Sequence, residues 1–142
     1  MFSGLDVERF MWSCMAIGIA EAAFGAARKY SKEREQFGQP IFNFQMIQDK
    51  LATMLVEIEA SKLLAYKGIT CWDEGNFKEA RMLAAQGKLY ACEMVNRVTA
   101  EAVHIHGGYT IYHLACIELD LCCEHPGFFE ITIVPACNSF VR

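Results

Sequence analysis

The sequence predicts an all-α fold: an up-down bundle of long helices followed by an irregular C-terminal tail. Two observations support this prediction. Apolar residues recur at three- and four-residue steps over three long stretches, and only short breaks separate these stretches. Short connections between long helices make sequential neighbours antiparallel. Because 142 residues are the length of one domain, we expect a single domain over 1–142.

The first predicted helix begins at Ser3-Gly4-Leu5-Asp6, which matches the Ser-x-x-Asp capping box. Gly38 and Pro40 are expected to end it, because glycine tolerates the backbone of a helix C-terminus and proline cannot continue a helix. The face of this helix that we expect to be buried carries Val7, Phe10, Met11, Cys14, Ile17 and Phe24.

Two further helices follow, separated by the turn sequence Asp73-Glu74-Gly75-Asn76 and closed by Gly107-Gly108. The expected buried face of the second helix carries Phe44, Ile47, Leu51, Met54, Leu55, Ile58, Ala65 and Ile69. That of the third carries Leu83, Gly87, Ala91, Met94, Val98, Ala102 and Ile105. Close approach between helices is expected at small residues, namely Gly18, Gly25, Ala84 and Gly87.

Charge, apolar runs and cysteine content argue against several classes of protein. A net charge of −4 gives no reason to expect a nucleic acid partner. We find no apolar run long enough to span a membrane and no basic segment before an apolar one, so neither a membrane partner nor a signal peptide is expected. Seven cysteines without framework spacing favour free thiols in a reducing compartment. We therefore expect a bacterial cytoplasmic or mitochondrial matrix protein, not a secreted one.

The motifs of the first 109 residues resemble, in order, those of the C-terminal helical domain of the acyl-CoA dehydrogenases. The matching segments include Arg34-x-Gln36-Phe37-Gly38 and Ile105-His106-Gly107-Gly108, which are specific as a pair. The resemblance covers residues 3–109 and is closest to the isovaleryl-CoA dehydrogenase-like branch. Residues 110–142 diverge from the family pattern, which suggests a diverged or frame-shifted end.

The resemblance implies FAD-dependent α,β-dehydrogenation of acyl-CoA thioesters of fatty acid or branched-chain metabolism. It implies Glu8 as the base that removes the α-proton, with Glu130 near the C-terminus as the alternative. Asp6 and Arg9 match substrate-binding positions. Read from the residues alone, Glu8 stabilises the helix dipole and Asp6 belongs to the capping box.

The resemblance also implies the cofactor contacts. Arg34 would bind the FAD pyrophosphate, since a guanidinium offers a fork of donors to phosphate oxygens. The same cofactor would be lined by Gln36, Phe37, Phe44, Gln45, His104, Gly107 and Gly108. Two alternatives stay open from the residues. Arg34 and the glycines are ordinary features of helix ends, and His104, His106, His113 and Cys116 are a conceivable metal set.

In this family FAD is shared with two further domains and with a neighbouring subunit, and an electron-transfer flavoprotein accepts the electrons. The resemblance thus implies a homo-oligomer. Because the isolated chain supplies only one wall of the site, we expect it to bind FAD weakly and not to turn over acyl-CoA. The alternative is a non-catalytic helical oligomerisation module derived from the same family.

Overall fold

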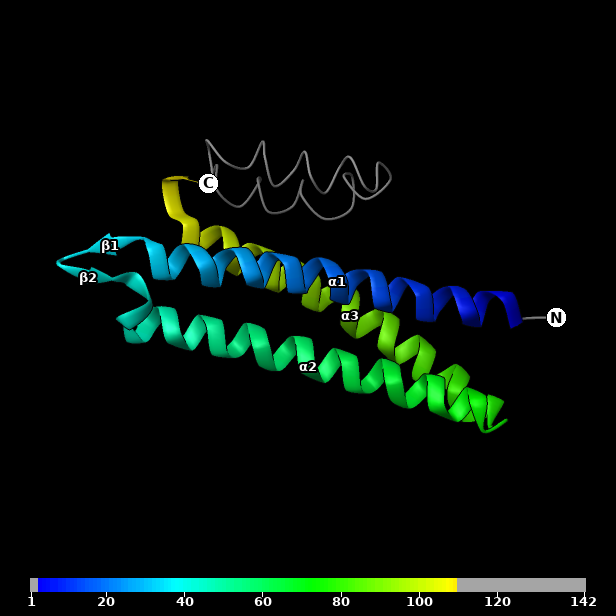
Figure 1. Cartoon of the computed structure of the whole chain (residues 1–142). Coiled ribbons are helices and arrows are strands. Elements are labelled where there is room, and N and C mark those ends of the chain that lie inside the picture. Colours follow the sequence, from blue (N-terminus) through cyan, green and yellow to red (C-terminus); the bar gives the residue numbers. More distant parts are fainter. Residues whose placement is uncertain (1–2, 110–142) are drawn as a thin grey trace.

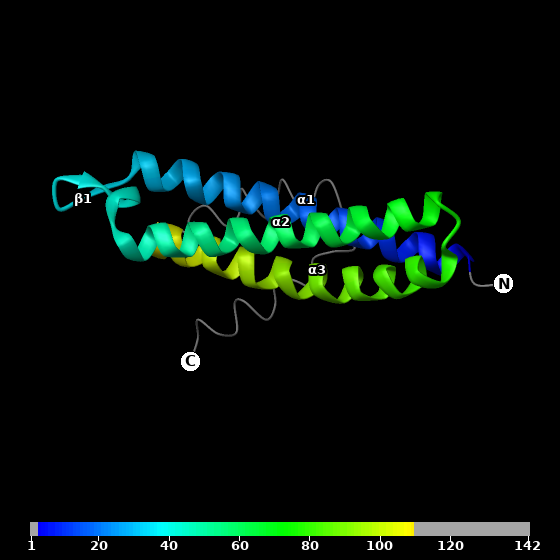
Figure 2. The same ribbon diagram turned by 90° about the horizontal axis from the view of Figure 1, so that it is seen from below.

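The computed structural model describes residues 3–109, and three long helices dominate this part (Figure 1). They are α1 (Ser3–Glu33), α2 (Gln45–Asp73) and α3 (Phe77–His106). α1 and α3 run in the same direction and α2 runs in the opposite one, so the predicted up-down all-α bundle is confirmed (Figure 2). The predictions on residues 110–142, Glu130 among them, lie outside the described residues.

A small β-hairpin joins α1 to α2, and it replaces the end that we expected for the first helix. α1 stops at Glu33, and β1 (Glu35–Gln36) pairs with β2 (Gln39–Pro40) in antiparallel register. Phe37 and Gly38 both have positive φ, 53° and 80°, as a tight two-residue hairpin turn requires. Gly38 therefore forms the hairpin turn, and the prediction that it ends the helix is wrong.

The other two predicted breaks are confirmed. Gly75, with a φ of 81°, lies in the turn between α2 and α3, where the backbone N–H of Asn76 donates to the carbonyl oxygen of Cys71. Gly107, with a φ of 60°, ends α3 and begins the short 3-10 helix η2 (Gly107–Tyr109). A second 3-10 helix, η1 (Ile41–Asn43), leads from the hairpin into α2.

The buried face of α3 is the one expected, and that of α1 agrees only in part. Every predicted core residue of α3 is buried, whereas Val7, Met11 and Cys14 of α1 are exposed. Phe10 and Ile17 of α1 are buried as predicted. The other buried residues of this helix are small or polar and include Asp6, Ser13, Ala16, Ala20 and Ala27. On α2, Leu55 is exposed while Leu51, Met54 and Ile58 are buried.

Close helix approach requires a glycine at Gly68, which was not expected, whereas a Cβ at the expected Gly87 would make an ordinary van der Waals contact. Gly87 of α3 faces Ser13 of α1: a Cβ at Gly87 would lie 3.5 Å from the Ser13 Oγ. Gly68 of α2 is tighter, because a Cβ there would lie 2.6 Å from Phe10 Cε1. Gly18 and Gly25 are exposed with no atom within 4 Å of such a Cβ, so the prediction was wrong for both.

One helix of the described part, Gly4–Glu33, is long and apolar enough to cross a membrane by length and composition, which the sequence analysis did not expect. The core helix of a soluble protein passes the same test, and 33% of the apolar window is buried within this chain. α1 contacts both other helices of the bundle. This is weak evidence for a membrane span.

Candidate functional site

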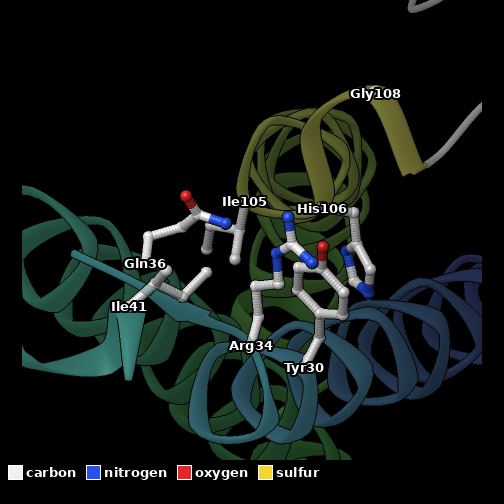
Figure 3. A pocket seen from close by; sticks show the side chains of 7 residues that line it. All are labelled: Tyr30, Arg34, Gln36, Ile41, Ile105, His106 and Gly108. Carbon is white, nitrogen blue, oxygen red and sulfur yellow. The ribbon is translucent and has the colours of Figure 1, made fainter. Parts of the chain in front are cut away.

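A pocket of about 400 Å³ lies at the hairpin end of the bundle, where α1 ends and α3 ends (Figure 3). It is formed by side chains from three places: the last turn of α1 and the residue after it, the hairpin with η1, and the end of α3. The lining residues are Tyr30, Arg34, Gln36, Ile41, Ile105, His106 and Gly108. The volume is within the ordinary range for a small-molecule site.

Local backbone geometry fixes the polar groups of this pocket. The N–H of Arg34 donates to the carbonyl oxygen of Tyr30 at 2.9 Å, and the N–H of Ile41 donates to the carbonyl oxygen of Arg34 at 2.8 Å. The backbone of Arg34 is thus hydrogen-bonded to α1 on one side and to the residue that follows the hairpin on the other. Figure 3 shows the Arg34 guanidinium extended between Tyr30 and the end of α3.

An aromatic stack forms another wall of the pocket. The rings of Tyr30 and His106 are stacked with centroids 4.6 Å apart and planes 25° from parallel. The Nδ1 of His106 lies 2.7 Å from the carbonyl oxygen of Ala102. The stack holds the end of α1 against the end of α3 and fixes the position of the imidazole ring.

The structure brings together some of the residues predicted to bind a cofactor. Arg34, Gln36 and Gly108 line the pocket. Phe37 is 92% exposed at the hairpin tip, and its ring makes an edge-to-face contact with Phe44 at 6.3 Å between centroids. These five residues lie on one end of the bundle, so a ligand wider than the pocket would meet both the pocket and the aromatic tip.

Other predicted cofactor residues lie apart from the pocket lining. Gln45 is exposed at the start of α2. The Nδ1 of His104 lies 3.6 Å from a carboxylate oxygen of Glu101, and Gly107 forms the turn that ends α3. The role of His104, Gly107 and Gln45 in binding a cofactor remains a prediction.

Sequence reasoning missed four lining residues, namely Tyr30, Ile41, Ile105 and His106. For two of them, Tyr30 and His106, the helical spacing in the sequence could have indicated their position. Tyr30 precedes Arg34 by one helical turn, and His106 lies two residues after His104 and so points to a different side of α3. Of the two histidines in this motif, the second is the one that faces the pocket.

The chemistry of this pocket suits a phosphate-bearing ligand with a flat ring. Arg34 offers a fork of charged donors, Gln36 offers an amide, and Ile41 and Ile105 offer apolar surface. These donors fit the flavin nucleotide that the family resemblance implies, with Arg34 the group that would hold its phosphates.

The predicted base lies at the opposite end of α1. Glu8 is exposed and its Oε1 accepts a hydrogen bond of 3.3 Å from the Trp12 Nε1. Between Glu8 and Arg34 the helix rises by about 40 Å, at 1.5 Å per residue. Glu8 and Arg34 of one chain therefore cannot act on the same small molecule.

The alternative of a metal set formed by the histidines and Cys116 has no support within the described residues. No group of three or more histidine, cysteine, aspartate or glutamate side chains is placed to hold a metal ion in that part of the chain. Two of the four candidate ligands, His113 and Cys116, lie outside the described range.

An ionic contact joins α2 to α3 close to His104. The Lys50 Nζ donates to the Glu101 Oε2, and His104 lies one turn further along α3. Burial disfavours the charged form of Glu101, but the hydrogen bond and charge of Lys50, together with His104, outweigh it and hold the pKa of Glu101 below its ordinary value of 4.5.

This lowered pKa predicts an acid-sensitive contribution to stability. A carboxylate whose pKa is depressed by folding stabilises the protein above its unfolded pKa, and this contribution is lost as the pH falls through the folded value. We therefore expect Lys50→Gln to lower the free energy of unfolding by less than about 1 kcal/mol at pH 7, because both side chains are partly exposed. The difference from wild type should vanish well below pH 4.5. Urea unfolding at several pH values measures it, with Lys67→Gln on an exposed position of α2 as the control. A difference that persists unchanged in acid would contradict the assignment.

Comparison with known proteins identifies the family of this chain. The family model "Acyl-CoA dehydrogenase, C-terminal domain" matches residues 1–119. The caffeyl-CoA reductase-Etf complex subunit CarC of Acetobacterium woodii is 45% identical over 105 residues, which are 74% of this chain and 27% of that protein. Butyryl-CoA dehydrogenase from Megasphaera elsdenii, a solved structure, is 47% identical with a TM-score of 0.70, over 74% of this chain and 27% of its own.

A chain in the solved structure of the electron transferring flavoprotein of Acidaminococcus fermentans matches equally well, with 45% identity, a TM-score of 0.70, and coverage of 74% of this chain and 27% of that one. The chain thus spans little more than a quarter of the length of these proteins. The isovaleryl-CoA branch is not singled out by these matches and stays a prediction. The match of the family model over most of the chain, together with the helical bundle, shows that this chain belongs to the acyl-CoA dehydrogenase family, as its C-terminal domain.

Proposed function

We propose that this chain is the flavin-contacting helical domain of an FAD-dependent enzyme that introduces an α,β double bond into acyl-CoA thioesters. The observation that carries this proposal is the pocket at the hairpin end, where Arg34, Gln36 and the Tyr30–His106 stack converge. A guanidinium, an amide and an aromatic wall are the groups that a phosphate-bearing ring system needs. Membership of the acyl-CoA dehydrogenase family supports FAD as that ring system.

The separation of the two ends of α1 supports a shared site. Because about 40 Å of helix lies between Glu8 and Arg34, one chain contributes its base to one active centre and its arginine to another. A homo-oligomer satisfies this arrangement, since each centre then receives Glu8 from one subunit and Arg34 from its neighbour. The relatives' greater length leaves room for the other walls of each centre.

In the proposed reaction the Glu8 carboxylate removes the proton from the carbon next to the thioester carbonyl. Bound flavin supplies the acceptor for the hydride that leaves the β-carbon, which balances the two-electron oxidation. Trp12 donates to Glu8 Oε1 and restricts the orientation of the carboxylate. Glu130 is the alternative base.

The electron acceptor that we propose is an electron-transfer flavoprotein. Two similar proteins point to it: one is named as a subunit of an Etf complex, and the other belongs to the structure of an electron transferring flavoprotein. Reduced flavin in this family member would pass its electrons to such a partner.

Flavin loading tests the proposal. All 142 residues would be fused behind the remainder of Megasphaera elsdenii butyryl-CoA dehydrogenase in place of its own matching segment. We expect the fusion to retain FAD and Arg34→Gln to lower its FAD affinity at least about tenfold, the loss of one charged hydrogen-bonded contact. Arg28→Gln, an exposed arginine earlier on α1, should leave the affinity unchanged. Flavin fluorescence on dilution measures the affinity.

The isolated chain provides the second half of this test. With one wall of the site it should bind FAD weakly, and tight stoichiometric binding to the isolated chain would contradict the shared site. A fusion that folds but takes up no FAD would contradict the proposal itself.

A second candidate, a non-catalytic oligomerisation module, is favoured by one observation. Val56, Leu63 and Tyr66 are exposed along one side of α2, and apolar surface of this kind favours self-association. Light scattering on the isolated chain, combined with the FAD result on the fusion, separates the two candidates. Stable oligomers together with a fusion devoid of FAD would favour the module.

A further inference from the structure

A tryptophan one turn along α1 holds one oxygen of the proposed base. Trp12 donates its indole Nε1–H to the Glu8 Oε1 at 3.3 Å, across four residues of the helix. Residues four apart lie one above the other on a helix, so the two side chains are natural neighbours. The second oxygen, Oε2, takes no part in this bond. The indole thus distinguishes two oxygens that are chemically equivalent in a free carboxylate.

The arginines at this end of the bundle are paired with a different carboxylate. Asp6, which is 2% exposed, has its Oδ1 3.1 Å from the Arg9 Nη1 and its Oδ2 2.9 Å from the Arg81 Nε. A guanidinium group on Glu8 would oppose proton abstraction, because a neighbouring cation favours the charged form of a carboxylate. Asp6 holds these two cations, whereas the group bonded to Glu8 is the neutral indole of Trp12.

The backbone of α3 comes close to α1 beside this tryptophan. A Cβ at Gly87 would lie 3.5 Å from the Ser13 Oγ, and the Ser13 hydroxyl donates to the carbonyl oxygen of Arg9 at 2.9 Å. Ser13 directly follows Trp12 in the sequence, and Lys88 directly follows Gly87. The contact of Ser13 with Gly87 therefore fixes the spacing of the two helices at the place where Trp12 and Lys88 project from them.

A lysine of α3 covers the indole ring. The Lys88 Nζ lies 6.0 Å from the centroid of the Trp12 ring, at about the outer limit of a cation–π contact. Because Lys88 belongs to α3 and Trp12 to α1, this contact ties the orientation of the indole to the packing of the helices. The Trp12 side chain is only partly buried, so the contact restricts rotamers that its surroundings leave open.

We propose that Trp12 is a positioning residue for the base Glu8 and that Lys88 of α3 holds the indole in place. This inference rests on the proposed function and adds two residues that the sequence motifs did not mark. With Oε1 bound by the indole N–H, Oε2 is the oxygen that accepts the α-proton of the acyl-CoA. The C–H bond breaks as the O–H bond forms, and the hydride of the β-carbon passes to bound flavin, which balances the reaction.

The expected gain is one of orientation. A free glutamate side chain on a helix surface samples several rotamers, and only some of them direct an oxygen at a bound substrate. The hydrogen bond from Trp12 selects an arrangement of Glu8 before the substrate arrives, so less freedom is lost in the chemical step. Loss of this bond should therefore lower the rate of proton abstraction and leave the affinity for acyl-CoA unchanged.

Flavin reduction in the fusion with the Megasphaera elsdenii enzyme tests the proposal. Trp12→Phe keeps an aromatic ring but removes the N–H, and we expect it to slow single-turnover reduction by butyryl-CoA about three- to tenfold. The butyryl-CoA concentration that gives half of the maximal rate should change less than about twofold. Trp12→Gln, whose amide can donate to Glu8 at the same helical spacing, should recover part of the rate.

The order of these variants separates a hydrogen-bond donor from a packing group. Phenylalanine is the better substitute for the shape of tryptophan, so a merely structural role would make Trp12→Phe faster than Trp12→Gln. Lys88→Met should slow the reaction about twofold on its own. It should have no further effect in the Trp12→Leu background, because Lys88 acts through the ring. Lys78→Met removes an exposed lysine earlier on α3 and should keep the wild-type rate.

The hydrogen bond itself can be measured in the full 142-residue chain. The chain has two tryptophans, and the second, Trp72, packs edge to face with Phe10 and Phe77. In ¹H–¹⁵N NMR spectra, Glu8→Leu should shift the Trp12 indole N–H signal upfield and leave the Trp72 signal in place. Lys88→Met should also move the Trp12 signal alone.

Three results would overturn the positioning role. They are an unchanged rate in Trp12→Phe, a faster Trp12→Phe than Trp12→Gln, and a Trp12 signal unchanged by Glu8→Leu. Glu8→Gln in the same fusion reports on the base separately. A large loss in Glu8→Gln beside a normal Trp12→Phe would keep the base and reject the positioning role, whereas a normal rate in Glu8→Gln would reject both.

Discussion

Replacing Met94 with alanine should lower the free energy of unfolding by about 2–5 kcal/mol. Met94 lies at the middle of α3, has no exposed surface, and belongs to the main core cluster with residues of all three helices. Truncation removes apolar contacts and leaves a cavity that three long packed helices cannot fill by small shifts. Urea unfolding followed by far-UV circular dichroism measures the loss as a lower midpoint at an unchanged slope.

Met82 provides a matched control on the same helix. Its side chain is 57% exposed, so Met82→Ala should change the free energy of unfolding by no more than about 0.5 kcal/mol. Equal losses for the two variants would mean that the core is not organised around the buried face of α3. The comparison removes any effect of methionine-to-alanine exchange on helix propensity, because both residues lie within α3.

The α3 helix could be predicted from sequence because its buried positions are apolar or small at regular spacing. Leu83, Gly87, Ala91, Met94 and Val98 follow the period of a helix without interruption. Apolar content and burial coincide on this helix, so the pattern in the sequence is the pattern in the core.

The α1 helix follows that rule only in part, since Phe10 and Ile17 are buried as predicted but Val7, Met11 and Cys14 are exposed. Its buried residues include the small side chains of Ser13, Ala16 and Ala20, and Ser13 faces Gly87 of α3. Ser13 is buried at little cost because its hydroxyl donates to the carbonyl oxygen of Arg9 at 2.9 Å. Larger residues such as Met11 remain outside. Hydrophobicity alone cannot select a face whose contact depends on small size.

Some residues of the candidate site could be predicted from the sequence and others could not. Arg34 and Gln36 were found because they lie in a motif. His106 and Tyr30 become pocket residues only through the meeting of two helix ends that are 76 residues apart in sequence. No motif marks the ion pair between Arg81 and Asp6 either. This contact depends on the parallel arrangement of α1 and α3, which no local sequence pattern encodes. Motifs mark single segments, whereas pockets and ion pairs arise where segments meet.

Replacing Glu8 with glutamine in the fusion enzyme should slow reduction of the flavin by butyryl-CoA by about 10²–10⁴-fold, the usual contribution of a positioned general base. Glutamine keeps the size of the side chain and its contact with Trp12 but cannot accept the α-proton. FAD content should be unchanged, because glutamine keeps the size of the side chain and Glu8 is not one of the residues proposed to hold the cofactor. Anaerobic stopped-flow mixing, which records the loss of flavin absorbance in one turnover, measures the chemical step without the electron acceptor.

Glu130→Gln is the matched variant, since that residue is the alternative base. We expect it to change the rate of flavin reduction by only a few-fold, less than the usual contribution of a general base. Glu8→Asp, which shortens the side chain but keeps the carboxylate, should recover part of the rate that Glu8→Gln loses. The opposite pattern, a normal rate in Glu8→Gln and a large loss in Glu130→Gln, would move the base to the C-terminal segment. It would also leave Glu8 as an acidic residue that stabilises the start of α1. The assignment of Arg34 to the cofactor does not depend on that outcome, because it rests on the pocket at the hairpin end.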